Sequence, residues 1–203
     1  MIEQIINGIN YRLDEETKTA EVIKKNGGYE GDIIIPETVV FNDVTYRVKS
    51  IGEGAFNCCD SLTSIVIPES VKSIGEGAFS WGKSLTSIVV AEGNTVYDSR
   101  EQCNAIIHTA TNALIRGCHN TIIPDSVTSI GKKAFSSCIS LTSIVIPESV
   151  TSIGEDAFIG CKSLTSITFQ GTIAQWNEID FGNRWNDEVP INVVHCTDGE
   201  VEI

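Results

Sequence analysis

The sequence predicts a repeat solenoid, an elongated stack of short β-strands and turns, and three observations support this fold class. First, a 23-residue unit recurs almost unchanged, with copies at 67–90, 123–146 and 146–169. Second, the strings Ser-Ile-Gly, Ala-Phe and Leu-Thr-Ser-Ile return at fixed positions within it. Third, the period-two pattern from Leu62 to Ile67 places Leu62, Ile65 and Ile67 inward and Ser64 and Val66 outward, as in a strand with one buried face.

The period and the abundance of Leu and Ile indicate a leucine-rich-repeat solenoid, whose units measure about 20–29 residues. Each coil should contribute a strand that ends at the proline, as at Pro68, because proline cannot donate a ladder hydrogen bond. Gly75 is expected to permit the next turn, and Ala78-Phe79 to pack a helical or 3₁₀ turn against the opposite side. One coil cannot bury its apolar face alone, so we expect about six coils stacked in register.

Residues 1–48 are expected to form an N-terminal cap and the first coil. Asn7-Gly8 predicts a hairpin turn, and 19–23 is a further strand candidate. The first coil begins at 32–36, and a second hairpin should turn at Asn42-Asp43. Because the end of a solenoid exposes backbone and core, we expect a cap with a polar outer face.

Residues 49–170 carry the repeats, interrupted by an insertion at about 97–118. Ile123-Pro124 follows Val90-Ala91 after 33 residues instead of 23. The extra residues predict a hairpin centred on Ala110-Thr111.

This centring pairs strand residues across the hairpin and has a consequence for two cysteines. It places Ile107 opposite Leu114, and Ile106 opposite Ile115. It also brings Cys103 opposite Cys118, within range of a disulfide if the compartment is oxidising.

Residues 171–203 leave the period and are expected to form a C-terminal cap, so that 1–203 is a single domain. A short helix is predicted at 173–179, with Trp176 and Trp185 sealing the last coil. The alternative is a pair of tryptophans that stack on a ligand.

The seven cysteines do not suggest a disulfide framework in a chain of 203 residues. Cys59, Cys138 and Cys161 share one repeat position, three residues before the leucine, where Gly82 stands in another copy. Because free cysteine is among the most buried residue types, we expect a column of small buried thiols with no redox role.

The charge balance excludes some partners. The chain has 27 acidic and 14 basic residues, a formal net charge of -13, which disfavours nucleic acid and anionic lipid and favours a soluble monomer. Apolar runs such as 33–35 are too short to span a bilayer, so no membrane insertion is expected. The start, Met1-Ile2-Glu3-Gln4, does not resemble a signal peptide, which leaves the cytoplasm or removal of a leader as alternatives.

No catalytic or cofactor-binding constellation is found, and we expect no enzyme. Cys103, His108, Cys118 and His119 match no paired-ligand spacing for zinc. Glu69, Asp125 and Glu148 recur in register and suggest a surface acidic ladder, with a weak calcium site as the alternative.

The outward side of the strands is the candidate binding surface, because solenoids bind partners on such extended faces. The residues predicted to point outward there are Ser64, Val66, Ser87, Val89, Ser143, Val145, Ser166 and Thr168. They are small and contain no Trp, Tyr or Arg, the residue types of tight interfaces. Either this face binds weakly and repetitively, or specificity lies in the insertion and the caps.

The unit I-P-x-S-V-T-S-I-G-x-x-A-F-x-x-C-x-S-L-T-S-I resembles the BspA-like class of bacterial leucine-rich repeats. The segments 7–22, 97–118 and 172–199 look like the entry, long-repeat and closing segments of that class. The resemblance implies a secreted or surface-displayed protein that binds proteins or surface polymers, in some members host matrix proteins, and has no shared catalytic residues. The expected function is a non-enzymatic protein-binding or adhesion module, and the alternative is a structural spacer or display domain without a specific ligand.

Overall fold

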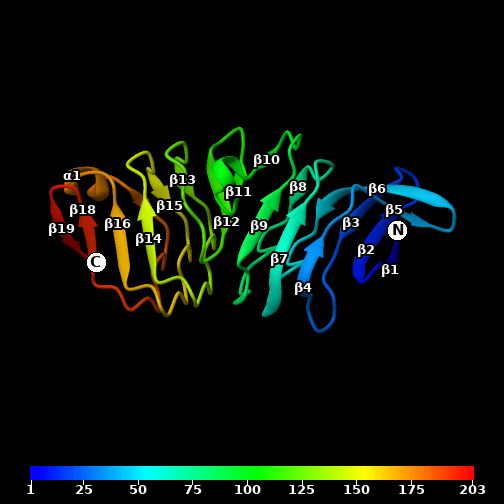
Figure 1. The fold of residues 1–203 in the computed structure, drawn as a ribbon, viewed down its shortest axis with the longest axis horizontal. Helices are drawn as coiled ribbons and strands as arrows, with labels where there is room; N and C mark the ends of the chain where they lie inside the picture. Colours follow the sequence, from blue (N-terminus) through cyan, green and yellow to red (C-terminus); the bar gives the residue numbers. More distant parts are fainter.

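The computed structural model describes all residues from 1 to 203 as an elongated row of strands with the two termini at opposite ends (Figure 1). It is dominated by strands, as the leucine-rich-repeat prediction requires. No helix in it has the length and apolar character needed to cross a membrane.

The N-terminal cap is a twisted sheet in the order β1-β2-β3-β6-β5, with β8 added beside β6. Its strands are β1 (Ile2–Ile6), β2 (Ile9–Asp14), β3 (Thr19–Val22), β5 (Thr38–Phe41), β6 (Val44–Ile51) and β8 (Ser73–Ile74). Both predicted hairpins are confirmed, since Ile6 pairs with Ile9 and Phe41 with Val44.

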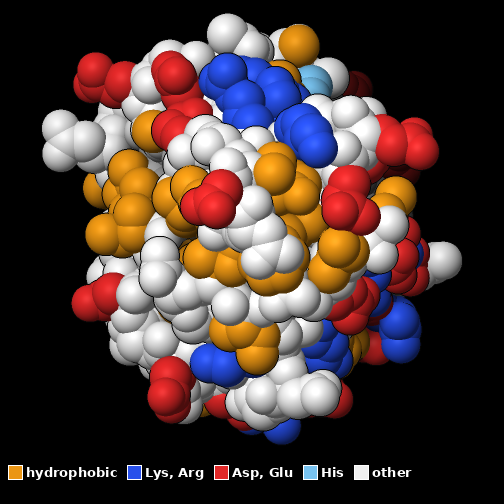
Figure 2. All heavy atoms as spheres, turned by 90° about the vertical axis from the view of Figure 1, so that its right-hand side faces the viewer, with side chains coloured by type: hydrophobic (Ala, Val, Ile, Leu, Met, Phe, Trp, Pro, Cys, Tyr) orange, Lys and Arg blue, Asp and Glu red, His pale blue; other side chains and the backbone are white.

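The outer face of this cap is mixed in character, and the expectation of a polar face was wrong. Ile5 is 69% and Val40 58% exposed, and Figure 2, which views this end, shows hydrophobic side chains among acidic ones. The reason is the two-residue period of a strand: β5 buries Val39 and therefore turns Val40 outward.

The long strands of successive coils form one side of the solenoid, in two separate sheets. The first contains β4 (Glu30–Ile34), β7 (Ser61–Ile67) and β9 (Ser87–Val90). The second contains β14 (Ser143–Ile146), β16 (Ser166–Phe169), β18 (Val193–Cys196) and the antiparallel β19 (Gly199–Glu202). The stack expected to be continuous is therefore interrupted between β9 and β14 (Figure 1).

The insertion and the Ser-Ile-Gly segments of the coils that follow it form a further sheet beside these strands. Its members are β10 (Tyr97–Asp98), β11 (Ala105–His108), β12 (Ala113–Gly117), β13 (Ser129–Ile130), β15 (Ser152–Ile153) and β17 (Asp180–Phe181). A 3₁₀ turn at Arg100–Gln102 lies between β10 and β11.

The hairpin of the insertion differs from its predicted register by a β-bulge. Ile107 pairs with Leu114 as expected, but the register shifts between Ile106 and Ile107. Ile106 therefore pairs with Arg116, and the predicted pairing with Ile115 was wrong. A bulge of this kind adds one residue to one strand and turns the following side chains to other faces.

The two cysteines considered for a disulfide are not bonded to each other in this structure. Cys103 and Cys118 are free, buried thiols. The Cys103 thiol contacts the Ala105 carbonyl at 3.9 Å, whereas that of Cys118 donates to the Thr86 carbonyl at 3.4 Å. The two side chains belong to different core clusters, one on each side of the insertion.

The Ala-Phe strings form the third side, where phenylalanines stack between coils. The rings of Phe56 and Phe79 are parallel at 5.1 Å, and those of Phe135 and Phe158 at 5.0 Å. The backbone here forms turns, and the predicted helical or 3₁₀ conformation at Ala78-Phe79 was wrong. Residues with positive φ on both sides, such as Gly77 at 61° and Trp81 at 60°, prevent a helix.

The glycine of Ser-Ile-Gly allows neighbouring coils to pack closely. Gly75 was expected to permit a turn, and that expectation was wrong. Its φ is not positive, and a Cβ there would lie 2.4 Å from the backbone nitrogen of Glu53 in the preceding coil. Gly154 and Gly182 meet the preceding coil in the same way. A side chain at this position would force neighbouring coils apart.

The C-terminal cap contains α1 (Ile173–Asn177), a shorter helix than the predicted 173–179. Thr172 and Gln175 close its N-terminus as a capping box. Trp176 is 2% exposed and lies edge-on to Phe169 at 5.4 Å, and Trp185 packs against Phe158 at 6.2 Å. Both tryptophans thus seal the last coil, as predicted.

We predict that Gly75→Ala lowers the free energy of unfolding by about 1–3 kcal/mol, the usual cost of overpacking. Gly82→Ala is the matched control, because its Cβ would meet only ordinary contacts of 3.6 Å and more. Urea unfolding followed by circular dichroism measures both. Equal stability of the two variants would show that coil spacing adjusts freely at Gly75.

We also predict that iodoacetamide at pH 8 modifies Cys58 and Cys196 in the native protein and spares the other five cysteines. Cys58 is exposed and Cys196 half-buried, whereas the rest are buried. Burial raises the pKa of Cys103 to about 11 and that of Cys161 to about 12, so that little reactive thiolate forms. Peptide mapping by mass spectrometry checks this, and rapid native labelling of Cys161 would contradict it.

Candidate partner-binding strand face

The eight residues predicted to point outward do so on strands β7, β9, β14 and β16. Val89, Ser143 and Val145 are exposed, and the other five are half-buried, while the residues between them face the core. Neighbouring coils place equivalent residues side by side, as for Val66 with Val89 and Ser143 with Ser166. We call this outward surface the strand face.

Outward β-branched residues, which we call the apolar stripe, occupy the same repeat position in successive coils; Val66 is half-buried and the others are exposed. Its members are Ile34, Val66, Val89, Ile122 and Val145. Ile34 is 70% exposed and lies opposite Val66, and Ile122 is 74% exposed. Sequence reasoning missed these two, although each stands two residues before a proline, as Val66 and Val145 do.

Polar residues continue the stripe towards the C-terminus and border it at the N-terminal coil. Towards the C-terminus, Val145 is followed in register by Thr168 and His195. At the N-terminal coil, Asp32 accepts hydrogen bonds from Ser64 at 2.6 Å and Thr63 at 2.8 Å. These two bonds lower the pKa of the Asp32 carboxyl, which keeps this end of the face anionic.

Side chains of the insertion close the free edge of β9, where the first sheet ends. The Ile88 amide donates to Asn104 Oδ1 at 3.3 Å, and the Val90 amide donates to Ser99 Oγ at 2.9 Å. Ser99 Oγ donates in turn to the Ala105 carbonyl at 2.7 Å. These groups replace the ladder partners that a further strand would supply, so β9 does not offer a bare edge.

A hollow of about 430 Å³ lies where the apolar stripe meets the insertion. Val89 and Glu92 line it on one side, and Ser99, Gln102 and Asn104 on the other. Glu101, Gln102 and Asn104 have φ of 57°, 55° and 54°, in the left-handed region. Such strained backbone persists only where its surroundings hold it, and it concentrates at functional sites.

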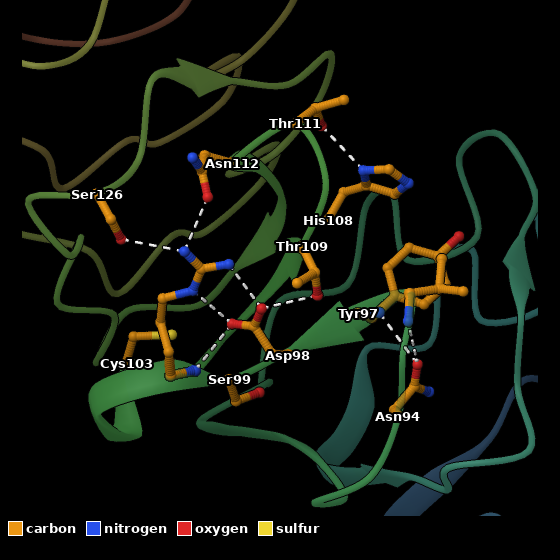
Figure 3. Close-up of polar contacts among 12 residues, drawn as sticks. Asn94, Tyr97, Asp98, Ser99, Cys103, His108, Thr109, Thr111, Asn112 and Ser126 are labelled. Carbon is orange, nitrogen blue, oxygen red and sulfur yellow. Dashed lines mark hydrogen bonds and ion pairs between the residues drawn. The ribbon is translucent and has the colours of Figure 1, made fainter.

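Asp98 and Arg100 hold the insertion in place (Figure 3). Arg100 Nε and Nη2 each donate to the Asp98 carboxylate at 2.7 Å, and Nη1 reaches Asn112 at 2.8 Å and Ser126 at 3.2 Å. Thr109 donates to Asp98 at 2.8 Å. Burial favours a higher pKa for Asp98, but the bonds from Arg100 and Thr109 outweigh it, and the pKa lies below its usual value.

Asn94 and Tyr97 anchor the insertion to the preceding coil. The Asn94 amide donates to the carbonyls of Pro68 at 3.0 Å and Val71 at 2.9 Å. The Tyr97 hydroxyl accepts the Ile74 amide at 3.1 Å. The insertion is therefore tied to the coils on both sides, which fixes its position beside the stripe.

The structure assembles no group of three His, Cys, Asp or Glu side chains able to hold a metal ion. Glu69, Asp125 and Glu148 are exposed at equivalent positions, as a surface ladder requires. The strand face itself offers apolar contact, hydroxyl groups and one hollow, which is the chemistry of a binding surface.

Comparison with known proteins agrees with the repeat architecture. A family model described as the BspA type leucine rich repeat region matches residues 37–111 and 115–186 in 6 copies. No curated protein sequence matches the chain.

Solved structures of bacterial leucine-rich repeat proteins are similar to this chain. One from Bacteroides ovatus is 28% identical over 89% of this chain and 40% of its own, with a TM-score of 0.44. A leucine rich cell surface protein from Faecalibacterium prausnitzii is 16% identical over 89% of this chain and 98% of its own, with a TM-score of 0.39. The pneumococcal vaccine antigen PcpA is 14% identical over 96% and 81%, with a TM-score of 0.49.

We predict that Asp98→Asn destabilises the protein by about 1.5–3 kcal/mol at pH 7, the usual value of hydrogen bonds to a charged group. Because the folded-state pKa of Asp98 is lowered, this stabilisation is complete above the unfolded pKa of about 3.9 and is lost as pH falls through the folded value. Urea unfolding at pH 7 and pH 3 should therefore show a difference between variant and parent that shrinks in acid.

The control is Asp60→Asn, which removes a salt bridge of 2.6 Å to Lys83 between two half-exposed side chains. That change should cost less than about 1 kcal/mol. A cost at Asp60 equal to that at Asp98, or a difference at Asp98 that is the same at both pH values, would contradict the role given to this pair.

Proposed function

The chain belongs to the family of BspA type leucine-rich repeat proteins, and from this premise we propose that it is a non-enzymatic adhesion module whose strand face binds proteins or surface polymers. We include in the proposal that it works outside the cell or at the bacterial cell surface, as a monomer. The apolar stripe is the single observation that supports this function most directly.

The stripe favours binding because its side chains are aligned rather than scattered. Neighbouring coils lie about 4.8 Å apart, so the outward side chains of Ile34, Val66 and Val89 form one contiguous surface. Isolated exposed apolar residues are normal on soluble proteins, whereas contiguous ones mark interaction sites. The hydroxyl groups beside them add hydrogen bonds for a polar partner.

The hollow beside Val89 supplies shape to an otherwise repetitive surface. The stripe alone repeats the same contact, which increases affinity but does not distinguish one partner from another. Gln102 and Asn104, whose φ angles are positive, border the hollow and belong to the insertion, which has no second copy in the chain. We therefore place selectivity for a partner at this hollow and assign most of the contact area to the stripe.

The test compares two variants that each replace outward apolar side chains with serine, on different faces of the protein. Val66→Ser, Val89→Ser and Val145→Ser are combined in one protein, and Ile5→Ser and Val40→Ser, both on the N-terminal end face, in the control. Immobilised matrix proteins and a glycan array are the probes. We expect the triple variant to lose binding at least about tenfold, the effect of roughly 1.4 kcal/mol, with the control unchanged.

Two outcomes would overturn the proposal. Equal binding by the triple variant and the parent protein would remove the strand face as the contact surface. Failure of the parent protein to bind any probe would favour the spacer or display role, in which the stripe has no ligand.

A further inference from the structure

We propose that the turn side of the solenoid contains a binding site for a small carboxylate with a short apolar chain, at the seam between the coil of Phe79 and the coil of Phe135. This site lies on a different side of the molecule from the strand face, and the inference does not rest on the proposed function. Its basis is a set of hydrogen-bond donors that the interrupted stacking leaves without acceptors.

Regular coils are joined on the turn side by a repeated pair of backbone bonds. The Gly54 and Phe56 amides donate to the Glu76 and Ala78 carbonyls of the next coil, at 3.2 and 2.7 Å. The coils that follow the insertion form the same pair, made by the amides of Lys133 and Phe135 and then by those of Asp156 and Phe158.

The coil of Phe79 is the exception. The Gly77 and Phe79 amides occupy the equivalent positions, and neither has an acceptor within the protein. Because the equivalent amides point along the solenoid axis towards the following coil, these two point into the seam. A buried amide without an acceptor costs about 1–3 kcal/mol, so Phe79, which is 5% exposed, is a strong candidate to bind an oxygen atom.

Arg116 lies on the other side of the seam at the repeat position of Ala78. Its side chain is only 2% exposed and has no carboxylate partner. Nη1 donates to the Lys133 and Ser136 carbonyls at 3.3 and 3.2 Å, and Nη2 to the Gly82 carbonyl at 3.4 Å and weakly to Cys138 Sγ at 3.9 Å. Its Nε is buried and has no partner.

These groups surround a hollow of about 230 Å³. Its lining includes Gly77, Phe79, Arg116 and Lys133. Lys132 and Glu76 also border it, and Lys132 forms ion pairs of 3.2 Å with both Glu76 and Glu155. The remaining charge, from Arg116 and Lys133, is positive, in a protein whose net charge is -13.

The lining defines the chemical class of the ligand. The unbonded Gly77 and Phe79 amides and the Lys133 ammonium are donors, and the buried Arg116 guanidinium, whose Nη atoms already bond to protein carbonyls, adds positive charge. The bound group must therefore be an acceptor, and a carboxylate accepts without donating. Ile74, Ala78, Phe79 and Ile115 make the rest of the lining apolar. The volume is below the roughly 300–1,000 Å³ of pockets for drug-sized ligands, which limits the apolar part to a short chain.

The experiment is a titration of the ¹⁵N-labelled full chain with pentanoate, followed by amide chemical shifts. We expect saturable downfield shifts of the Gly77 and Phe79 amide protons, with the Gly54 and Phe56 amides unchanged because they are already bonded. Pentanamide, which has the same shape without the charge, should bind at least about tenfold more weakly.

Lys133→Gln tests the charge, and Lys162→Gln on an outer coil is its control. Lys133 forms no ion pair, so its replacement should leave the fold intact and weaken pentanoate binding at least about threefold. Arg116→Gln should abolish binding, with the fold checked by the dispersion of the same amide spectrum. Absence of shifts at Gly77 and Phe79, equal binding of pentanamide, or tighter binding of inorganic phosphate would each overturn the assignment of a carboxylate site.

Discussion

The distance between neighbouring coils is the constraint on which the rest of this structure depends. Parallel strands in a sheet lie about 4.8 Å apart, and every side of the solenoid must respect that spacing at once. It requires glycine at Gly75, where a Cβ would meet the backbone of the preceding coil, and it brings the rings of Phe56 and Phe79 into a stack. It also aligns outward residues such as Val66 and Val89, so the same contact that builds the core creates the surface.

The insertion interrupts this spacing once, and its effect differs between the strand side and the turn side of the solenoid. On the strand side, Ser99 and Asn104 supply oxygen atoms to the amides of β9, so the edge is sealed by side chains. On the turn side, Arg116 supplies donors to carbonyls of both flanking coils, but no group supplies acceptors to the Gly77 and Phe79 amides. The hollow near Val89 and the hollow near Arg116 are therefore two results of one interruption.

Most of the coil architecture could be predicted from the sequence, because each buried position follows a local pattern. The hairpins at Asn7-Gly8 and Asn42-Asp43 depend on turn residues alone, and both are present. The bulge after Ile106 could not be predicted, since it reflects how the insertion fits between two coils. Nor could the burial of Arg116, whose acceptors Gly82 and Ser136 are 34 and 20 residues away in sequence.

The regularity of the coils on either side of the insertion has a consequence for how such a protein changes its length. Coils such as those of Phe135 and Phe158 present equivalent hydrogen-bonding edges to the preceding and the following coil. A tandem duplication of the 23-residue unit would therefore stack through the same contacts that already join these coils. Unequal recombination can then lengthen or shorten the apolar stripe while the insertion remains a single copy. Under the proposed function, avidity would follow the number of coils and selectivity would follow the insertion, two separate parts of the sequence.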